Sequence, residues 1–200
     1  MLRPSGFLRA ASHFLLLMTI TAFRSIDSSR NFVEKKMIVD FSALPDSSRV
    51  WIYQADREFS EAEMPVVKKR LNDFVEKWTS HSKEVKAGFD IRYNRFIIIA
   101  LDESHVPAGG CSIDSSMHTI QAIEKDFQNP LTNRMNFAFK ENGVVKTAGR
   151  TEFESLTSAG KIDSATIVFN NLVSLKSELA SQWEIPLHQS WHKQLFPVRN

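Results

Sequence analysis

The sequence predicts an α+β fold, with a ferredoxin-like β-α-β-β-α-β core and a C-terminal α/β annex. Strand-like stretches alternate along the chain with two helical patterns, and clusters of Gly, Pro and Asn separate them. With 200 residues, 42% of them hydrophobic, the chain can also bury a substantial core. We expect a leader over residues 1–36, the ferredoxin-like core over residues 37–148 and the annex over residues 149–200.

The core is predicted to open with a strand and a helix. Residues 50–53 are β-branched and aromatic, which favours a strand. Ser60 and Glu63 have capping-box spacing, but Pro65 suits a first helical turn, so we expect the helix to begin near Met64. Its apolar residues recur at the spacing of one helical face, namely Met64, Val67, Leu71, Phe74, Val75 and Trp78.

Two strands and a second helix follow. Residues 85–93 alternate between apolar and polar, whereas residues 96–101 are all apolar, which indicates a strand covered on both faces. After the break at residues 107–110, a helix is predicted with Ile113, Met117, Ile120, Ile123 and Phe127 on its apolar face. Residues 135–139 alternate again, and Asn142-Gly143 predicts a hairpin into residues 144–146.

This order fits a ferredoxin-like sheet, in which the first and third strands are central and the second and fourth lie at the edges. The apolar runs at residues 50–53 and 96–101 suit the central places. A different mixed sheet built from the same elements is the alternative. Helices cover only one face of such a sheet, so we expect the annex or a second subunit to cover the other.

The annex is predicted to contain two helices and a strand. Thr151 and Glu154 have capping-box spacing, and Gly160 would end that helix. Residues 167–169 read as a short strand. A stripe for a further helix is formed by Leu172, Leu175, Leu179 and Trp183.

The net charge and the N-terminal segment indicate whether the protein binds nucleic acid or membranes. Residues 1–36 carry six Lys and Arg against two Asp and Glu, so the remainder has a net charge of −2, and we expect no nucleic-acid binding. The apolar run at residues 14–23 is shorter than a membrane span and suits a secretion signal. We expect translation to start at Met37 in a cytoplasmic protein. The alternative is export or tethering through residues 1–23, which would bring membrane contact.

Cys111 is the strongest candidate for chemistry. It follows two glycines and precedes a predicted helix, whose N-terminal N–H groups favour a thiolate or a bound anion. Asp114 and His118 lie on the same side of that helix, so these three are candidate catalytic residues. The candidate anion-binding residues are Gly109, Gly110, Cys111 and Ser112. Cys111 and His118 are two helical turns apart, about 10 Å, so a self-capped helix with a solvated Asp114–His118 pair is the alternative.

We expect no metal or other cofactor. A single cysteine excludes an internal disulfide and a multi-cysteine metal site. His188 and His192 have the spacing of helical zinc ligands, but Gln189 stands where the zincin pattern needs a Glu.

Five stretches together resemble a family of uncharacterised bacterial proteins often labelled "ABC transporter ATPase". They are Trp51–Gln54, Ile91–Phe96, Gly110–Asp114, Ile167–Asn171 and Ser190–Lys193. The resemblance extends from about Arg49 to Phe196. ATP hydrolysis would need a phosphate-binding loop of the form G-x-x-x-x-G-K-[ST], which this sequence lacks, so we expect no ATPase activity.

Part of the annex resembles GYF-type adaptor modules, without their Gly-Tyr-Phe triplet. The matching residues are Phe153, Leu156, Gly160, Ile162, Thr166 and Val168. This resemblance implies binding of proline-rich peptides through aromatic residues.

The expected function is therefore that of a non-enzymatic domain acting through protein contacts, with an unidentified partner or with a second copy in a dimer. A thiol-dependent enzyme or anion-binding site at Cys111 is one alternative. A peptide-binding adaptor using the annex is the other.

Overall fold

The computed structural model describes residues 39–196. The predicted leader and the start at Met37 lie outside the described residues. Within residues 39–196, none of the helices has the length and apolar character needed to cross a membrane.

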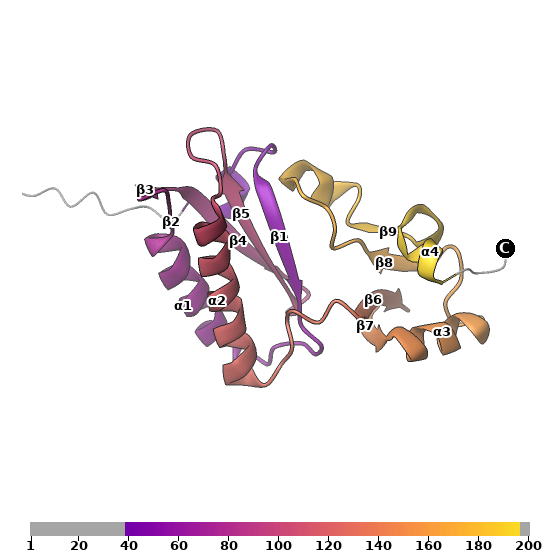
Figure 1. The fold of residues 1–200 in the computed structure, drawn as a ribbon. Coiled ribbons are helices and arrows are strands. Elements are labelled where there is room, and N and C mark those ends of the chain that lie inside the picture. The colour runs from indigo at the N-terminus through magenta and orange to yellow at the C-terminus, as the bar shows by residue number, and fades with distance from the viewer. Residues whose placement is uncertain (1–38, 197–200) are drawn as a thin grey trace, which may run out of the picture. The chain divides into compact units, whose positions relative to one another are not determined.

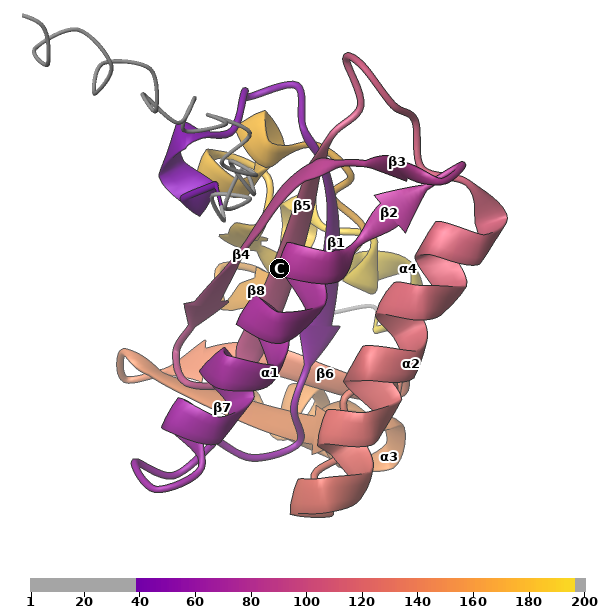
Figure 2. The same ribbon diagram turned by 90° about the vertical axis from the view of Figure 1, so that its left-hand side faces the viewer.

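Three antiparallel strands form the first sheet, in the order β1-β5-β4. They are β1 (Arg49–Gln54), β4 (Lys86–Arg92) and β5 (Phe96–Asp102). Two helices, α1 (Met64–Lys77) and α2 (Gly110–Phe127), cover one face of this sheet (Figures 1 and 2). These five elements confirm the strands and helices predicted for this part of the chain. The structure adds a 3-10 helix, η1 (Phe41–Ala43), and a short hairpin of β2 (Thr79–Ser80) and β3 (Lys83–Glu84).

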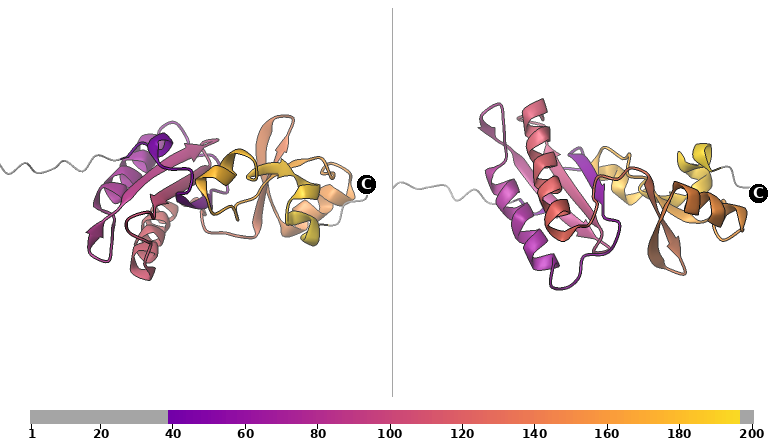
Figure 3. Two further views of the ribbon diagram at one scale, coloured as in Figure 1. Left: turned by 90° about the horizontal axis from the view of Figure 1, so that it is seen from above. Right: turned by 60° about the horizontal axis from the view of Figure 1, so that its bottom comes forward.

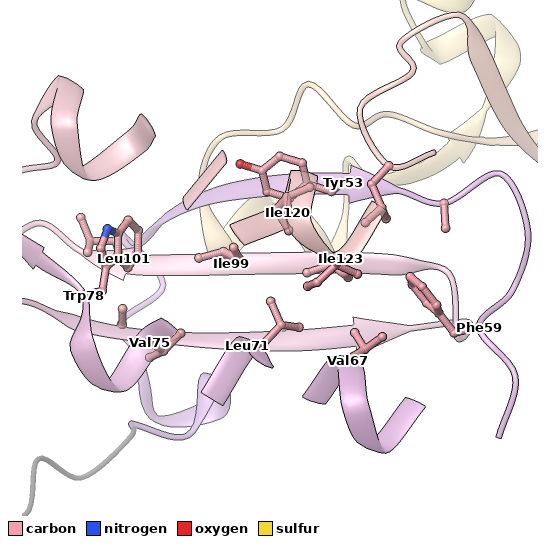
Figure 4. Close-up of a cluster of buried hydrophobic side chains, with 14 of the residues drawn as sticks. Tyr53, Phe59, Val67, Leu71, Val75, Trp78, Ile99, Leu101, Ile120 and Ile123 are labelled. Carbon is pink, nitrogen blue, oxygen red and sulfur yellow. The ribbon is translucent and has the colours of Figure 1, made fainter. Parts of the chain in front are cut away.

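The helical face of the sheet is packed as the apolar spacing predicts. Val67, Leu71 and Val75 of α1 are buried, and they meet Ile120 and Ile123 of α2 over the sheet (Figure 4). Every residue of β5 is buried, which confirms the expected strand covered on both faces.

Both features predicted for the start of α1 are present, namely the Ser60–Glu63 capping box and a proline in the first helical turn. Glu63 accepts a hydrogen bond from the Ser60 N–H at 2.8 Å, and the Glu63 N–H donates to the Ser60 hydroxyl at 3.3 Å. The helix itself begins at Met64, with Pro65 in its first turn. The capping-box contacts therefore close the turn that leads into α1.

A second sheet of four strands lies beyond the first, in the order β7-β6-β8-β9. It contains β6 (Asn136–Glu141), β7 (Val144–Gly149), β8 (Ile167–Phe169) and β9 (Glu184–Pro186) (Figure 3). The helical segments of this region are α3 (Arg150–Ser158), η2 (Lys176–Ala180), η3 (Leu187–Gln189) and α4 (His192–Leu195). Asn142 and Gly143 both have positive φ, as the predicted hairpin requires.

The ferredoxin-like sheet is not confirmed, because β6 pairs with β7 and β8. β1 is therefore an edge strand, and the expectation that it is central is wrong. The physical reason lies in Phe137 and Phe139, whose rings pack against Phe153; the Phe137 ring also meets Phe196. These partners belong to the region after β7, so β6 joins the second sheet.

The second sheet covers the helix-free face of the first, with residues from both the predicted core and the predicted annex. Phe96 of β5 stacks on Phe169 at 4.7 Å between ring centroids and meets the Trp183 ring edge-on at 5.0 Å. Ile98 and Ala100 lie in the same buried cluster. The chain passes from the first sheet to the second between α2 and β6, and contacts join the described residues, 39–196, into one compact unit.

Two local predictions in the annex are wrong. The segment from Leu172 to Trp183 contains η2 and extended chain instead of one helix, because the backbone hydrogen-bonds elsewhere. The Ser174 carbonyl accepts from Val50, and the Lys176 N–H donates to Ser48, each at 2.8 Å. In α3 the N-cap is Gly149, so no capping box forms at Thr151; Gly160 follows the helix with a φ of +69°, as expected.

Candidate functional site

The edge of β1 is open along part of its length because β6 does not pair with it. Val50 donates its N–H to the Ser174 carbonyl, and a single antiparallel bridge joins Arg49 to Leu175. Strand alternation points the backbone groups of Ile52 in the same direction as the Val50 N–H, away from β5. Within residues 39–196, Ile52 has no backbone partner on that side.

A cavity of about 560 Å³ lies along this edge, and we refer to it as the β1 groove. All six residues of β1 line it, and the segments around β6 and β8 supply the opposite wall. The remaining lining residues are Met117, Leu131, Thr132, Asn133, Arg134, Asn136, Phe137, Ala138, Phe169, Asn171, Leu172, Val173, Ser174, Trp191 and His192.

Side-chain amides fix one end of the groove. The buried Gln54 donates to the Asn136 carbonyl at 3.0 Å and accepts from the Asn171 amide at 2.9 Å. Asn171 in turn accepts a hydrogen bond from the indole of Trp183 at 3.0 Å. These bonds tie β1 to both β6 and the loop after β8, so the two walls are held together.

The charged lining of the groove is entirely positive. Arg49 and Arg134 line it, and no Asp or Glu does. The Arg49 guanidinium stacks over Trp51 at 4.8 Å and lies 3.7 Å from Glu103, which is outside the groove. Arg134 is exposed and has no ion-pair partner among the described residues. Burial raises the pKa of the Tyr53 hydroxyl, and a hydrogen bond with Ser116 and the charge of Arg134 partly offset this.

Exposed apolar side chains surround the groove. Leu172, in its lining, is 68% exposed, and Met135 and Leu175, next to lining residues, are 50% and 39% exposed. Trp191 lies in the wall, and its indole N–H is buried without a hydrogen-bond partner among the described residues. Large exposed apolar side chains that gather at one place are typical of a contact surface.

His192 supports the same wall. It is 2% exposed, stacks on Trp191 at 4.0 Å and contacts the Ser190 hydroxyl through Nδ1 at 2.7 Å. Burial lowers its pKa to about 4, so the imidazole is neutral at neutral pH. It therefore adds no charge to the groove.

The predicted residues Cys111, Asp114 and His118 do come together, at a separate place. All three are exposed and line a depression of about 670 Å³ on the surface of α1 and α2, with Arg70 and Asp73 opposite. Cys111 lies inside the first turn of α2 rather than before it. No hydrogen bond joins these three side chains within the described part of the chain, so no nucleophile–base pair is formed.

Much of the predicted anion-binding segment is satisfied internally. The Gly109 N–H donates to the Ser80 hydroxyl at 3.1 Å, and the Ser112 hydroxyl donates to the Gly109 carbonyl at 2.7 Å. The Glu103 carboxylate already accepts from the Ala108 N–H at 2.8 Å, which places a negative charge next to this turn. Gly110 and Cys111 remain at the surface, but the neighbouring carboxylate opposes an anion.

The other sequence candidates do not form sites. His188 binds the Ser164 carbonyl at the surface while His192 is buried, and no group of three potential ligands in residues 39–196 is arranged to hold a metal. Of the GYF-like residues, Phe153, Ile162 and Val168 are buried in the core of the second sheet. They are therefore inaccessible to a peptide.

Sequence reasoning missed the β1 groove because the groove depends on sheet pairing. The spacing of Leu172 fits a helical stripe, and Arg134 belongs to no pattern in the sequence. The only local signal was the β-branched and aromatic character of residues 50–53, which indicates a strand but not which edge stays open.

Comparisons of this chain with protein-family models, with curated proteins and with solved structures gave no match.

Proposed function

We propose that this protein is a binding module that holds a short peptide segment of a partner protein in the β1 groove. The observation that carries the proposal is the open edge of β1 within a groove bordered by exposed apolar side chains. An unpaired strand edge offers backbone donors and acceptors to another chain. Function through protein contacts is also what the sequence favours.

The lining supports a peptide better than catalysis. The acidic side chains needed for paired-carboxylate chemistry are absent from the lining, and its histidine is buried and neutral at neutral pH. What the groove offers is aromatic and aliphatic surface, side-chain amides and two guanidinium groups, which together suit recognition.

Peptide display against the full chain tests this function. Random dodecapeptides would be selected, and their Kd measured on the parent protein and on Leu172→Asp, which puts a charge at the rim. Val66→Asp is the matched control, because Val66 is an exposed apolar residue on α1, outside the lining of the groove. We expect Leu172→Asp to weaken binding about tenfold or more and Val66→Asp to leave it unchanged.

Failure to select any peptide that binds, or equal losses in the two variants, would refute the proposed function. The selection identifies the ligand by its sequence, so a positive result does not depend on capturing an unknown protein from an extract.

A further inference from the structure

We propose that the ligand of the β1 groove is an extended segment that adds to β1 as an antiparallel fourth strand, with alternating apolar and acidic side chains. This inference rests on the proposed function and states which peptide the groove selects. It follows from three features of the groove: its backbone groups, its two walls and its charge.

The backbone groups set the pairing. Residues 174–176 already run antiparallel to the beginning of β1. The Ser174 N–H donates to the Glu178 carboxylate at 2.7 Å, so it does not donate to the Val50 carbonyl. Beyond that point, both backbone groups of Ile52 face the groove. An incoming strand in line with residues 174–176 would pair with Ile52 and then with Gln54. At about 3.3 Å per residue, the stretch from Trp51 to Gln54 takes about four residues of ligand.

The two walls set the alternation. Trp51 and Tyr53 of β1 belong to the cluster under the helices, whereas Val50 and Ile52 belong to the cluster shared with the second sheet. Cross-strand partners in a sheet point to the same face. Ligand residues opposite Ile52 would therefore meet the other lining residues of this second cluster, which are Ala138, Phe169 and Val173.

Charge sets the other half of the pattern. Arg49 follows the same alternation as Trp51 and Tyr53, and Arg134 lines the same groove, where its charge lowers the pKa of Tyr53. Ligand residues opposite Trp51 and Tyr53 thus face two guanidinium groups and no carboxylate of the lining. A carboxylate at these places would gain charge-assisted hydrogen bonds, and a Lys would be repelled.

The probe is the capped hexapeptide acetyl-Val-Glu-Val-Glu-Val-Glu-amide, titrated into the full chain by calorimetry. In antiparallel pairing the residues opposite Ile52 exchange backbone hydrogen bonds with it, and these are the Val residues. We expect N-methylation of the Val residues to weaken binding by about tenfold or more, and N-methylation of the Glu residues to have little effect. Because only the peptide changes, this comparison does not depend on the folding of a variant.

The charge is tested on the protein. Arg134→Glu should weaken binding of the Val-Glu probe about tenfold and improve binding of the matching Val-Lys peptide. Lys68→Glu, the same charge change on the exposed side of α1, should alter neither.

The inference is overturned if the Val-Glu probe does not bind, if both N-methylated peptides bind like the parent, or if Arg134→Glu leaves the preference for Glu over Lys unchanged. Where display still yields peptides sensitive to Leu172→Asp, any of these results would remove the proposed ligand pattern and leave the groove function standing. Where display yields none, the function itself falls.

Discussion

At the scale of single residues, the ionisable side chains of the groove wall and of the α1–α2 surface differ in how deeply they are buried. His192 is buried under Trp191 with its pKa lowered, whereas Cys111, Asp114 and His118 are exposed in a shallow depression. The residues that the sequence favours for chemistry are thus the ones with the least structural support. The buried His192 instead packs against the Trp191 ring in the groove wall.

Stability should depend on pH through His192. Its pKa falls from an ordinary value of 6.5 to about 4 on folding, so between these values the unfolded chain binds more protons than the folded one. Stability is then full above about pH 6.5 and falls as the pH drops toward 4, by on the order of 3 kcal/mol. Urea unfolding across this range measures the slope. His192→Gln should flatten it, and His188→Gln, at an exposed position, should not; equal slopes in all three proteins would contradict the assignment.

Cys111 should be alkylated by iodoacetamide in the folded protein, because its side chain is exposed in the first turn of α2. Mass spectrometry of the intact chain should show one adduct formed under native conditions. Reaction only after denaturation would mean that the thiol is covered and that the α1–α2 depression is absent in solution.

At the scale of elements, the sequence predicts those strands and helices whose burial is decided by local pattern. β5 is recognisable because all its residues are apolar, and α1 because its apolar residues share one face. The segment from Leu172 to Trp183 has an equally regular stripe, yet it is not a helix. Its backbone forms hydrogen bonds with the beginning of β1, and the Glu178 carboxylate accepts from the N–H groups of Ser174 and Leu175. No local sequence pattern predicts these bonds.

The amide network at the end of β1 should contribute measurably to stability. Gln54→Leu would leave the Asn136 carbonyl and the Asn171 amide without their partner in a part-buried place. We expect a loss of about 1–3 kcal/mol in the free energy of unfolding, measured with denaturant. Gln121→Leu, at an exposed position of α2, is the control and should change stability by less than about 0.5 kcal/mol.

At the scale of the described molecule, the two sheets share one buried cluster, and the β1 groove occupies the place of the missing fourth strand. Tyr93 helps to join the sheets: its hydroxyl donates to Glu184 of β9 at 2.8 Å, and Lys140 of β6 contacts both. Composition and spacing predict the α+β class, but the pairing of β6 with the second sheet depends on contacts between distant aromatic side chains. The groove exists because β6 pairs there and not with β1. It could not be predicted from the sequence, because that pairing depends on contacts between residues far apart in the chain.

Amide hydrogen exchange by NMR tests the open edge of β1 most directly. In the free protein we expect the Ile52 N–H to exchange quickly, whereas the N–H groups of Trp51 and Tyr53, which face β5, are protected. Saturation with a display-selected peptide or the Val-Glu probe should then protect Ile52 and leave its neighbours unchanged. An Ile52 N–H already as protected as that of Trp51 in the free protein, or one that stays unprotected with peptide bound, would contradict the account.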